Sequence, residues 1–351
     1  MTAKKATFDE SMEALQIQWR KSSGHVDTTV CGYQNGHQRK WILPSEKWEQ
    51  GLWPQIRSGT PHSLPDYLKR NGIQPHTGKH NLKSSWVLCA NLYFPFGQTA
   101  DGKALLASFL QKHVSSAIKS VDDLHLEYAE DGDLSPEKLL GESGGSRGSG
   151  QTSPDLAFHV NGGTGLILIE NKLTEHSFYR CSARTKKNDE GRPANPDPER
   201  CKGIKGVLAQ HQKQCHQYFW GRKYWDILRP VMNTTAMGTL TRCPAATAGY
   251  QLFRQQALAE GIAQGKRSDG TQYDFVHSCV ALDDRNVTLK RCLKRTGITD
   301  LESGWSALFN DEAQAHFKVF THQDWVAWVR ANSAPAIWQS WLDYVEARYG
   351  Y

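Results

Sequence analysis

The sequence lacks any run of about 18 apolar residues, the length that a membrane-spanning helix requires. Its N-terminal stretch, MTAKKATFDE, has no apolar core of the kind that a secretory signal carries. We therefore expect a cytoplasmic protein without a membrane partner, in which the eight cysteines are reduced. None of these cysteines belongs to a C-x-x-C pair, so the spacing of common zinc fingers is also missing.

A strong excess of one charge is absent as well. The chain has 42 lysine and arginine residues against 36 aspartate and glutamate residues, which gives a net charge of +6. This modest basic balance favours a polyanionic partner without requiring one. At 351 residues the chain is long enough for one large domain with additions, or for two domains, and it contains no internal repeat.

Three charged side chains stand in a stretch, SPDLAFHVNGGTGLILIENKL (153–173), that is otherwise apolar enough to be buried. Its turn sequence, NGGT (161–164), predicts a β-hairpin, because Asn and Gly accept the positive φ of tight turns. A turn centred on the two glycines places Asp155 directly opposite Glu170. Side chains alternate along a strand, so Lys172 shares the face of Glu170. Two carboxylates and one ammonium group therefore converge on one side of the hairpin.

Two neighbouring carboxylates repel each other, and a cation between them relieves the repulsion. Mg²⁺ binds one or two carboxylates and keeps its other positions for water and phosphate oxygens. A lysine beside such an ion can stabilise negative charge or orient the attacking water. The pattern thus predicts a phosphodiester hydrolase that uses Mg²⁺ or Mn²⁺, with Asp155 and Glu170 as metal ligands. The alternative is a structural ion pair between Lys172 and one of the two carboxylates.

Pro154-Asp155 and Glu170-Asn171-Lys172 resemble the signature of the PD-(D/E)XK nuclease superfamily in order, spacing and hairpin context. Further segments look like parts of a bacterial group of predicted restriction endonucleases in that superfamily: NLKSSWVLCANLYFPFG (81–97), ENKLTEHSFYRC (170–181) and GYQLFRQQAL (249–258). The resemblance implies an α/β (α+β) restriction-endonuclease-like fold, in which helices flank a mixed central sheet. It also implies a metal-dependent endonuclease that hydrolyses DNA in restriction or defence.

The resemblance extends to residues outside the hairpin. Many members carry a Gln on a helix after the Glu-x-Lys strand, where it supports the site or touches DNA. Gln251 is the candidate here, with Arg254 one helical turn later as a nucleic-acid contact. An acidic residue on a preceding helix usually completes the site, but the helix expected at 101–120 has no Glu and only a terminal Asp. Glu127 and Glu142 are candidate substitutes.

Because the expected helix lacks the acidic residue that usually completes the site, two other functions stay open. One is a non-catalytic nucleic-acid-binding protein with a degenerate nuclease fold, and the other is an RNA-directed nuclease. A Gly/Ser-rich loop at 141–153 precedes the hairpin, and Arg147 would be its phosphate contact. The residues also leave open whether the chain forms a homodimer.

We divide the chain into a loop-rich N-terminal extension (1–80), a nuclease core (81–282) with a cysteine-containing insertion at 174–248, and a mainly helical C-terminal extension (283–351). Hydrophobic periodicity predicts helices at 8–20, 103–119, 206–228, 250–265 and 335–351, and strands at 122–130 and 273–282. The segment 317–332 is predicted to begin as a strand and continue as a helix.

A cluster of cysteines surrounds the polar stretch 183–203: Cys181, Cys201, Cys215 and Cys243. This stretch is too polar to be held in place by burial, and ligation of zinc or of an iron–sulfur cluster would pin it. His211 and His216 are alternative ligands. Some members of the superfamily carry a four-cysteine iron–sulfur cluster, although with different spacing. The other interpretation is that these cysteines are small buried hydrophobes.

Overall fold

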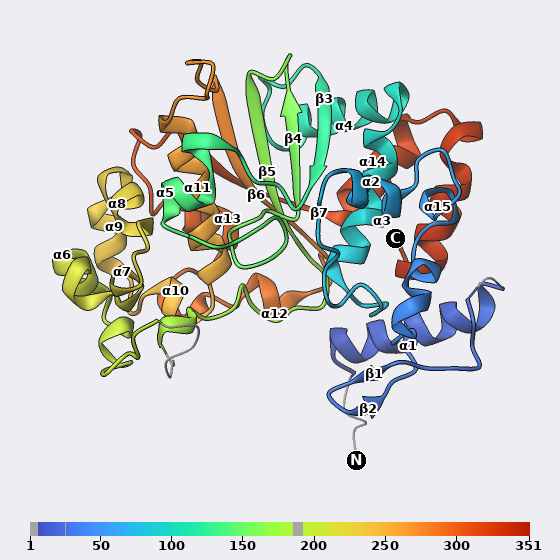
Figure 1. The fold of residues 1–351 in the computed structure, drawn as a ribbon, viewed down its shortest axis with the longest axis horizontal. Coiled ribbons are helices and arrows are strands. Elements are labelled where there is room, and N and C mark those ends of the chain that lie inside the picture. Colours follow the sequence, from blue (N-terminus) through green and yellow to red (C-terminus); the bar gives the residue numbers. More distant parts are fainter. Residues whose placement is uncertain (1–5, 25, 185–191) are drawn as a thin grey trace.

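The computed structural model describes residues 6–24, 26–184 and 192–351. Its centre is a five-stranded mixed sheet of order β3-β4-β5-β6-β7 (Figure 1). The strands are β3 (Val121–Leu126), β4 (Leu156–Val160), β5 (Gly165–Lys172), β6 (Phe275–Leu282) and β7 (Ala315–Thr321). The first two pairings are antiparallel and the last two are parallel. A mixed sheet flanked by helices is thus confirmed.

The predicted hairpin forms with the predicted register. Leu156 of β4 pairs with Ile169 of β5, and residues 161–163 of the turn all have positive φ. Asn and Gly adopt this conformation at low cost, which is why the turn closes at this point. Continuing the pairing by one residue sets Asp155 opposite Glu170, at the end of the sheet where β5 leaves it.

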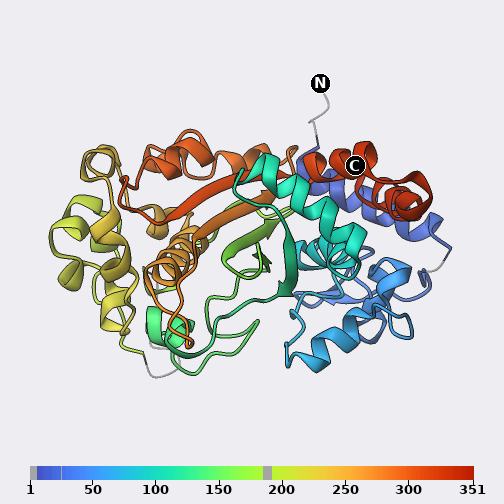
Figure 2. The ribbon, with the colours of Figure 1, turned by 90° about the horizontal axis from the view of Figure 1, so that it is seen from above.

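Strand β5 is buried along its whole length because both faces of the sheet are covered. Ile167 and Ile169 point into one hydrophobic core, and Leu166 and Leu168 point into the other. Burial of each of these aliphatic side chains contributes about 2 kcal/mol to the free energy of unfolding. Seen from above, the sheet lies between the two helical layers (Figure 2).

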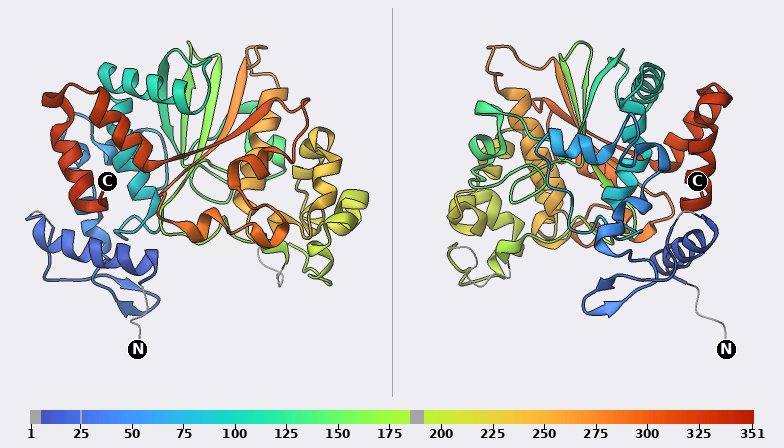
Figure 3. Two further views of the ribbon diagram at one scale, coloured as in Figure 1. Left: turned by 180° about the vertical axis from the view of Figure 1, so that it is seen from behind. Right: turned by 45° about the vertical axis from the view of Figure 1, so that its right-hand side comes forward.

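The hydrophobic core on one face of the sheet contains helices from the N-terminal and C-terminal parts of the chain. These are α1 (Phe8–Ser22), α2 (Leu64–Arg70), α3 (Ser85–Gly97), α4 (Ala100–His113), α14 (His322–Asn332) and α15 (Pro335–Tyr349). Helix α3 is apolar on all sides, and twelve of its residues are buried, as expected for a helix in the centre of a core. Helix α15 lies beside α1, where Gln16 Nε2 donates to Arg348 O at 2.8 Å (Figures 1 and 3). The two ends of the described chain therefore share one core.

The other core contains α11 (Tyr250–Gln264), which lies against the sheet, and a lobe of short helices (Figure 3, left). The short helices on this side are α5 (Pro136–Leu140), α6 (Ile204–Gln214), α7 (His216–Phe219), α8 (Tyr224–Leu228), α9 (Thr234–Thr239), α10 (Pro244–Thr247), α12 (Val287–Lys290) and α13 (Leu301–Ser306). A separate two-stranded sheet joins β1 (Tyr33–Gln34) to β2 (His37–Gln38). The 3₁₀ helices are Ser45–Gly51, Pro54–Ile56, Gly132–Leu134, Ser182–Arg184, Arg200–Lys202, Arg229–Val231 and Lys294–Thr296.

Three predicted elements differ from the observed ones. The single helix predicted at 206–228 is wrong, because Cys215 is extended and ends α6, and Gly221 has positive φ before α8. The helix predicted at 103–119 ends at His113, and the strand predicted at 122–130 ends before Glu127, whose φ is 48°. Residues 185–191 of the polar stretch lie outside the described residues. Within the described chain, every helix is too short or too polar to cross a membrane.

Candidate active site

Three carboxyl-bearing residues lie in one row across the ends of three adjacent strands. Leu126 of β3 pairs with Leu156 of β4, and the next residue, Glu127, donates its backbone N–H to Asp155 O at 3.1 Å. Asp155 in turn stands opposite Glu170. All three carboxyl residues line one cavity of about 180 Å³.

Burial and mutual repulsion change the protonation of this row. Burial and the charge of Glu170 raise the pKa of Asp155 to about 8, although the N–H of Asn171 donates to Asp155 Oδ2 at 2.8 Å and opposes this shift. Burial, Asp155 and Glu170 together raise the pKa of Glu127 well above the usual range. A row of three carboxylates is therefore stable only when protons or a cation reduce its negative charge.

Lys172 lies on the predicted face, and its Nζ is 2.5 Å from Glu170 Oε1. The ammonium group is buried, which opposes its charge, but Glu170 and Glu175 raise the pKa of Lys172 above its usual value. The raised pKa favours the protonated, cationic form of Lys172 at neutral pH. The structural ion pair that the sequence offered as an alternative is present, and it belongs to the same site.

The end of β5 is anchored by hydrogen bonds to α3. Asn171 Nδ2 donates to Ser85 O at 2.6 Å, and Ser85 Oγ donates to Glu175 Oε1 at 2.5 Å. Glu175 Oε2 also accepts the N–H of Leu173 at 2.8 Å. Asn171 points to the face opposite Glu170 and Lys172, so these bonds fix the strand end without occupying the cavity.

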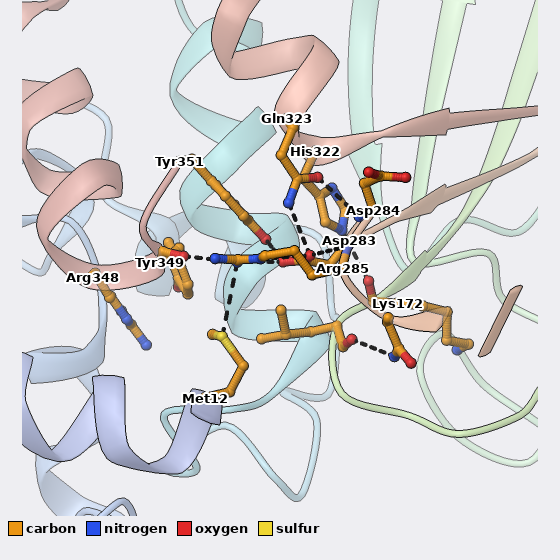
Figure 4. A network of polar contacts seen from close by, with 12 residues as sticks. Met12, Lys172, Asp283, Asp284, Arg285, His322, Gln323, Arg348, Tyr349 and Tyr351 are labelled. Atoms are coloured by element: carbon orange, nitrogen blue, oxygen red, sulfur yellow. Dashed lines mark hydrogen bonds and ion pairs between the residues drawn. The ribbon is translucent and has the colours of Figure 1, made fainter. Parts of the chain in front are cut away.

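A second anchor holds the carbonyl of Lys172 (Figure 4). His322 Nε2 donates to Lys172 O at 3.0 Å, and its Nδ1 lies 3.2 Å from the hydroxyl of Tyr93. Because a carbonyl oxygen only accepts, the proton of the neutral imidazole is on Nε2. In the adjoining network, the buried Asp283 accepts hydrogen bonds from Arg285 Nε at 2.9 Å and from Tyr351 Oη at 2.8 Å. The chain terminus is thereby tied to the sheet beside Lys172.

Helix α11 brings both predicted residues, Gln251 and Arg254, to the cavity. Gln251 Oε1 is buried and has no hydrogen-bond partner within the described part of the chain. The sequence analysis missed Gln255, which also lines the cavity and donates to Cys279 O of β6 at 2.9 Å. Its position four residues after Gln251, on the same helical face, is the signal that could have identified it.

The two candidate substitutes for the third acid have different environments. Glu127 lines the cavity, whereas the buried Glu142 lies outside its lining. Glu142 accepts the hydroxyl of Thr152 at 2.8 Å and that of Tyr224 at 2.5 Å, and it pairs with Arg254 Nε at 3.3 Å. Its hydrogen bonds hold the loop before the hairpin against the helices.

That loop forms one wall of the cavity through residues 148–153. Gly148 has a φ of 79°, and an added Cβ there would lie 2.9 Å from Gln74 O, so only glycine fits. Arg147 donates its Nε to Glu127 O at 3.0 Å and its Nη2 to Leu126 O at 2.9 Å. Arg147 thus holds the backbone of Glu127, and its role as a phosphate contact stays a prediction.

The donor set of the cavity suits Mg²⁺. No group of three or more His, Cys, Asp or Glu side chains among residues 6–24, 26–184 and 192–351 is already arranged to hold a metal ion. Mg²⁺ needs no such group, because it takes one or two carboxylates and completes its shell with water and substrate phosphate. Asp155 and Glu170 can supply these carboxylates, and Glu127 offers a third.

A basic groove of about 900 Å³ lies along the segment that follows β5 and the segment that precedes α11. Its exposed basic residues are His176, Arg180, Arg291, Lys294 and Arg295. No Asp or Glu is among the described residues that line this groove. Next to Arg180, the exposed Tyr179 has a φ of 55°; burial of its hydroxyl raises the pKa of Tyr179, and Glu175, Glu170 and Asp155 add to this effect.

All four cysteines of the predicted cluster line a second, small cavity. His216 lines it as well, whereas His211 is outside the lining and its Nε2 is 2.9 Å from Asp226 Oδ1. The structure thus brings together the four cysteines and one of the two histidines. Their capacity to hold a metal stays a prediction at this point.

Comparison with known proteins identifies a family. Residues 13–350 match the model of a family described as restriction endonuclease associating with ARP. The comparison with curated proteins found no match, and neither did the comparison with solved structures. The family match covers nearly the whole chain, and it confirms both the predicted relationship to restriction endonucleases and the predicted fold class.

Proposed function

This chain belongs to the family of restriction endonucleases associating with ARP, and from that premise we propose that it is a metal-dependent endonuclease. Its substrate in this proposal is DNA, and its biological setting is restriction or defence. The observation that carries the proposal is the row formed by Glu127, Asp155 and Glu170 in one cavity, with Lys172 beside it. A cytoplasmic location and a homodimer remain predictions.

Each residue of the cavity has a role in this proposal. Asp155 and Glu170 bind Mg²⁺, and Glu127 adds negative charge or a third ligand. The bound ion would polarise the scissile phosphate and activate a water molecule. Lys172 stays protonated beside Glu170, so it stabilises the negative charge that develops on the phosphate in the transition state. Gln251 has a buried, unsatisfied amide oxygen that can accept a hydrogen bond from the attacking water.

The basic groove supports nucleic acid as the substrate. Arg and Lys side chains contact phosphate oxygens without reading the base sequence, and here they are exposed in a groove whose described lining holds no acidic residue. The exposed ring of Tyr179, next to Arg180 of the groove, can pack against a base or a sugar.

The test is a cleavage assay with the purified full chain. Supercoiled, linear and single-stranded DNA, and RNA, are each incubated with Mg²⁺, with Mn²⁺ or with EDTA. We expect the DNA substrates to be cut in the presence of either ion and to stay intact in EDTA. Asp155→Ala should lower cleavage at least ~100-fold, as expected when an electrostatic contributor of this kind is removed.

The controls separate this function from its rivals. Asp66→Ala removes an exposed carboxylate from the first turn of α2, outside the cavity lining, and should leave cleavage unchanged. Binding of DNA without cleavage under every metal condition would contradict the proposal and support a non-catalytic binding protein. Cleavage of RNA alone would support an RNA-directed nuclease instead.

A further inference from the structure

Four cysteines from separate segments of the chain surround one small cavity in the helical lobe, away from the acidic row. Cys181 follows β5, Cys201 lies in a 3₁₀ helix, Cys215 separates α6 from α7, and Cys243 precedes α10. The cavity has a volume of about 20 Å³, close to the space that one water-sized particle needs. The rest of its wall is mostly apolar, including Trp225, together with the polar side chains of His216 and Gln217.

Backbone hydrogen bonds hold three of these segments together. The N–H of Cys181 donates to Ala245 O at 2.9 Å, next to the start of α10. The N–H of Cys243 donates to Lys202 O at 3.0 Å, one residue after Cys201. The convergence of these chain segments is therefore built into the backbone.

The sulfurs also receive hydrogen bonds from N–H donors. The backbone N–H groups of Gln217 and Tyr218 hydrogen-bond to the sulfur of Cys215. In the same way, the backbone N–H groups of Ala245 and Ala246 hydrogen-bond to the sulfur of Cys243. A neutral thiol packs in an apolar core without N–H donors, whereas a negatively charged thiolate is stabilised by them.

The remaining two sulfurs have side-chain amide donors. Gln217 Nε2 donates to Cys181 Sγ at 3.0 Å, and Asn195 Nδ2 donates to Cys201 Sγ at 3.3 Å. Both amides are buried, and burying them here is favourable only because they are hydrogen-bonded. Partners of this kind orient metal ligands and balance their charge in known metal sites. Each of the four sulfurs thus has an N–H donor that could stabilise a thiolate ligand.

We propose that Cys181, Cys201, Cys215 and Cys243 bind one tetrahedral thiophilic cation, with zinc as the expected ion. Four cysteine thiolates are a complete ligand set for structural zinc. The cavity volume matches one ion rather than a four-iron cluster. Among the described residues, no three metal-binding side chains are arranged to hold an ion. Binding therefore requires the cysteine side chains to rotate toward the cavity.

Such an ion would connect the helical lobe to the active strand. Cys181 follows Lys172 by a short loop, and Cys243 precedes Gln251 by another, so the ion would brace two of the segments that line the basic groove. It would also fix both sides of the polar stretch that precedes Cys201. Because a structural metal site contributes directly to folding energy, loss of the ion should loosen this lobe.

The test measures metal content, which is independent of cleavage. Full-length protein, purified without chelator, is dialysed and analysed for zinc and iron, and we expect about one zinc per chain. Cys215→Ser should lose the zinc, whereas Cys292→Ser, another half-buried cysteine outside the cluster, should keep it. Gln217→Ala removes the donor to Cys181 and should weaken zinc binding about 10-fold.

A second measurement covers the case in which Cys215→Ser does not fold. Co²⁺ is added to metal-depleted wild-type protein, and the sulfur-to-cobalt absorption band reports the number of thiolate ligands. An intense band that saturates at one Co²⁺ per chain and disappears when zinc is added supports the proposal. Protein without zinc that also gives no such band overturns it, and so does stoichiometric iron with a brown chromophore.

Discussion

The backbone N–H of Glu127 donates to the carbonyl oxygen of Asp155 at 3.1 Å, and this bond sets the two residues side by side at the end of the sheet. Glu127 has a φ of 48°, a conformation that costs a non-glycine residue about 1 kcal/mol. Hydrogen bonds from Arg147 to the carbonyls of Leu126 and Glu127 hold it there. Local strain of this kind is common where a residue is held for function. The third acid of the candidate site thus comes from a strand end rather than from a helix.

Glu127→Gln should reduce Mg²⁺-dependent cleavage by at least ~100-fold, because the amide keeps the shape of the side chain and removes its charge from the row. Cleavage is measured against Mg²⁺ concentration, and we expect the variant to need more of the ion. Glu137→Gln changes an exposed carboxylate of α5 and should behave as the wild type. A fully active, folded Glu127→Gln protein would remove Glu127 from the site.

Lys172→Met should abolish cleavage and spare DNA binding. The variant keeps the aliphatic part of the side chain and loses the charge beside Glu170, for an expected reduction of at least ~100-fold. Lys318→Met is the matched control, because Lys318 also forms an ion pair, with Glu302 at 3.3 Å, on strand β7. Cleavage and DNA binding are measured separately, with thermal unfolding as the check on folding. Equal losses in the two variants would contradict a specific role for Lys172.

Arg180→Ala and Arg295→Ala should each weaken DNA binding and reduce its salt dependence. If each side chain contacts one phosphate, the slope of log affinity against log salt should fall by about one per substitution. Binding is measured by fluorescence anisotropy between low and moderate salt. Lys69→Ala, an exposed cation of α2, should leave the slope unchanged. An unchanged slope in both arginine variants would rule out the groove as the DNA path.

Arg254→Met should mainly lower stability. Its guanidinium pairs with the buried Glu142, and removing one partner of such a pair leaves a buried carboxylate uncompensated, at a cost of about 3 kcal/mol. Chemical denaturation of the single variants and of the double variant with Glu142→Gln measures the coupling between the two residues. If Arg254→Met is as stable as the wild type but binds DNA poorly, the pair is not structural and Arg254 is a DNA contact.

The stability of the protein should fall on acidification between pH 6.5 and pH 4, in part because of His322. Burial lowers the pKa of His322 to about 4, whereas the unfolded chain has an ordinary value near 6.5. The unfolded state therefore binds a proton that the folded state rejects, and the folded state loses about 2 kcal/mol from this group at pH 5 relative to pH 7. Above pH 6.5 the contribution is complete.

His322→Gln isolates this effect. The amide can still donate to Lys172 O but does not titrate, so the difference in unfolding free energy between variant and wild type should shrink as the pH falls from 7 to 5. Urea unfolding at each pH measures it, and the comparison cancels the titration of Asp283 and the other groups that the two proteins share. A difference that is independent of pH would show that His322 binds the same number of protons in the folded and unfolded states, so that folding does not lower its pKa.

The parts of the fold that could be predicted from the sequence depend on local features. The hairpin register follows from one turn, so the relation of Asp155 to Glu170 was accessible without knowledge of the fold. The helix with Gln251 was accessible from its periodicity. The assignment of Glu127 depended on the pairing of β3 with β4, which joins remote segments and contains a register shift near Val121. Such a pairing leaves no local pattern.

The break of the helix predicted at 206–228 has a similar cause. Its apolar spacing is compatible with one helix, but Cys215 takes an extended conformation and its sulfur lies against the small cavity. This extended conformation depends on contacts with three other segments of the chain, and the hydrophobic periodicity within 206–228 contains no information about them. The same holds for Glu142, whose partners Thr152, Tyr224 and Arg254 come from separate elements.

One neighbour of strand β5 is close to it in the sequence and the other is remote, so the two pairings should form at different stages of folding. Its antiparallel partner β4 is joined to it by a tight turn, whereas its parallel partner β6 brings Phe275 to Gly165 across more than a hundred residues. Closing a long loop costs more entropy than closing a short one, and contacts between remote residues form late. Asp155 and Glu170 should therefore meet early, on a hairpin that still lacks the helix with Gln251. In a nascent chain the two acidic residues would be paired before the rest of the cavity forms, so the proposed activity would have to wait until the layer that contains Gln251 has packed against the sheet.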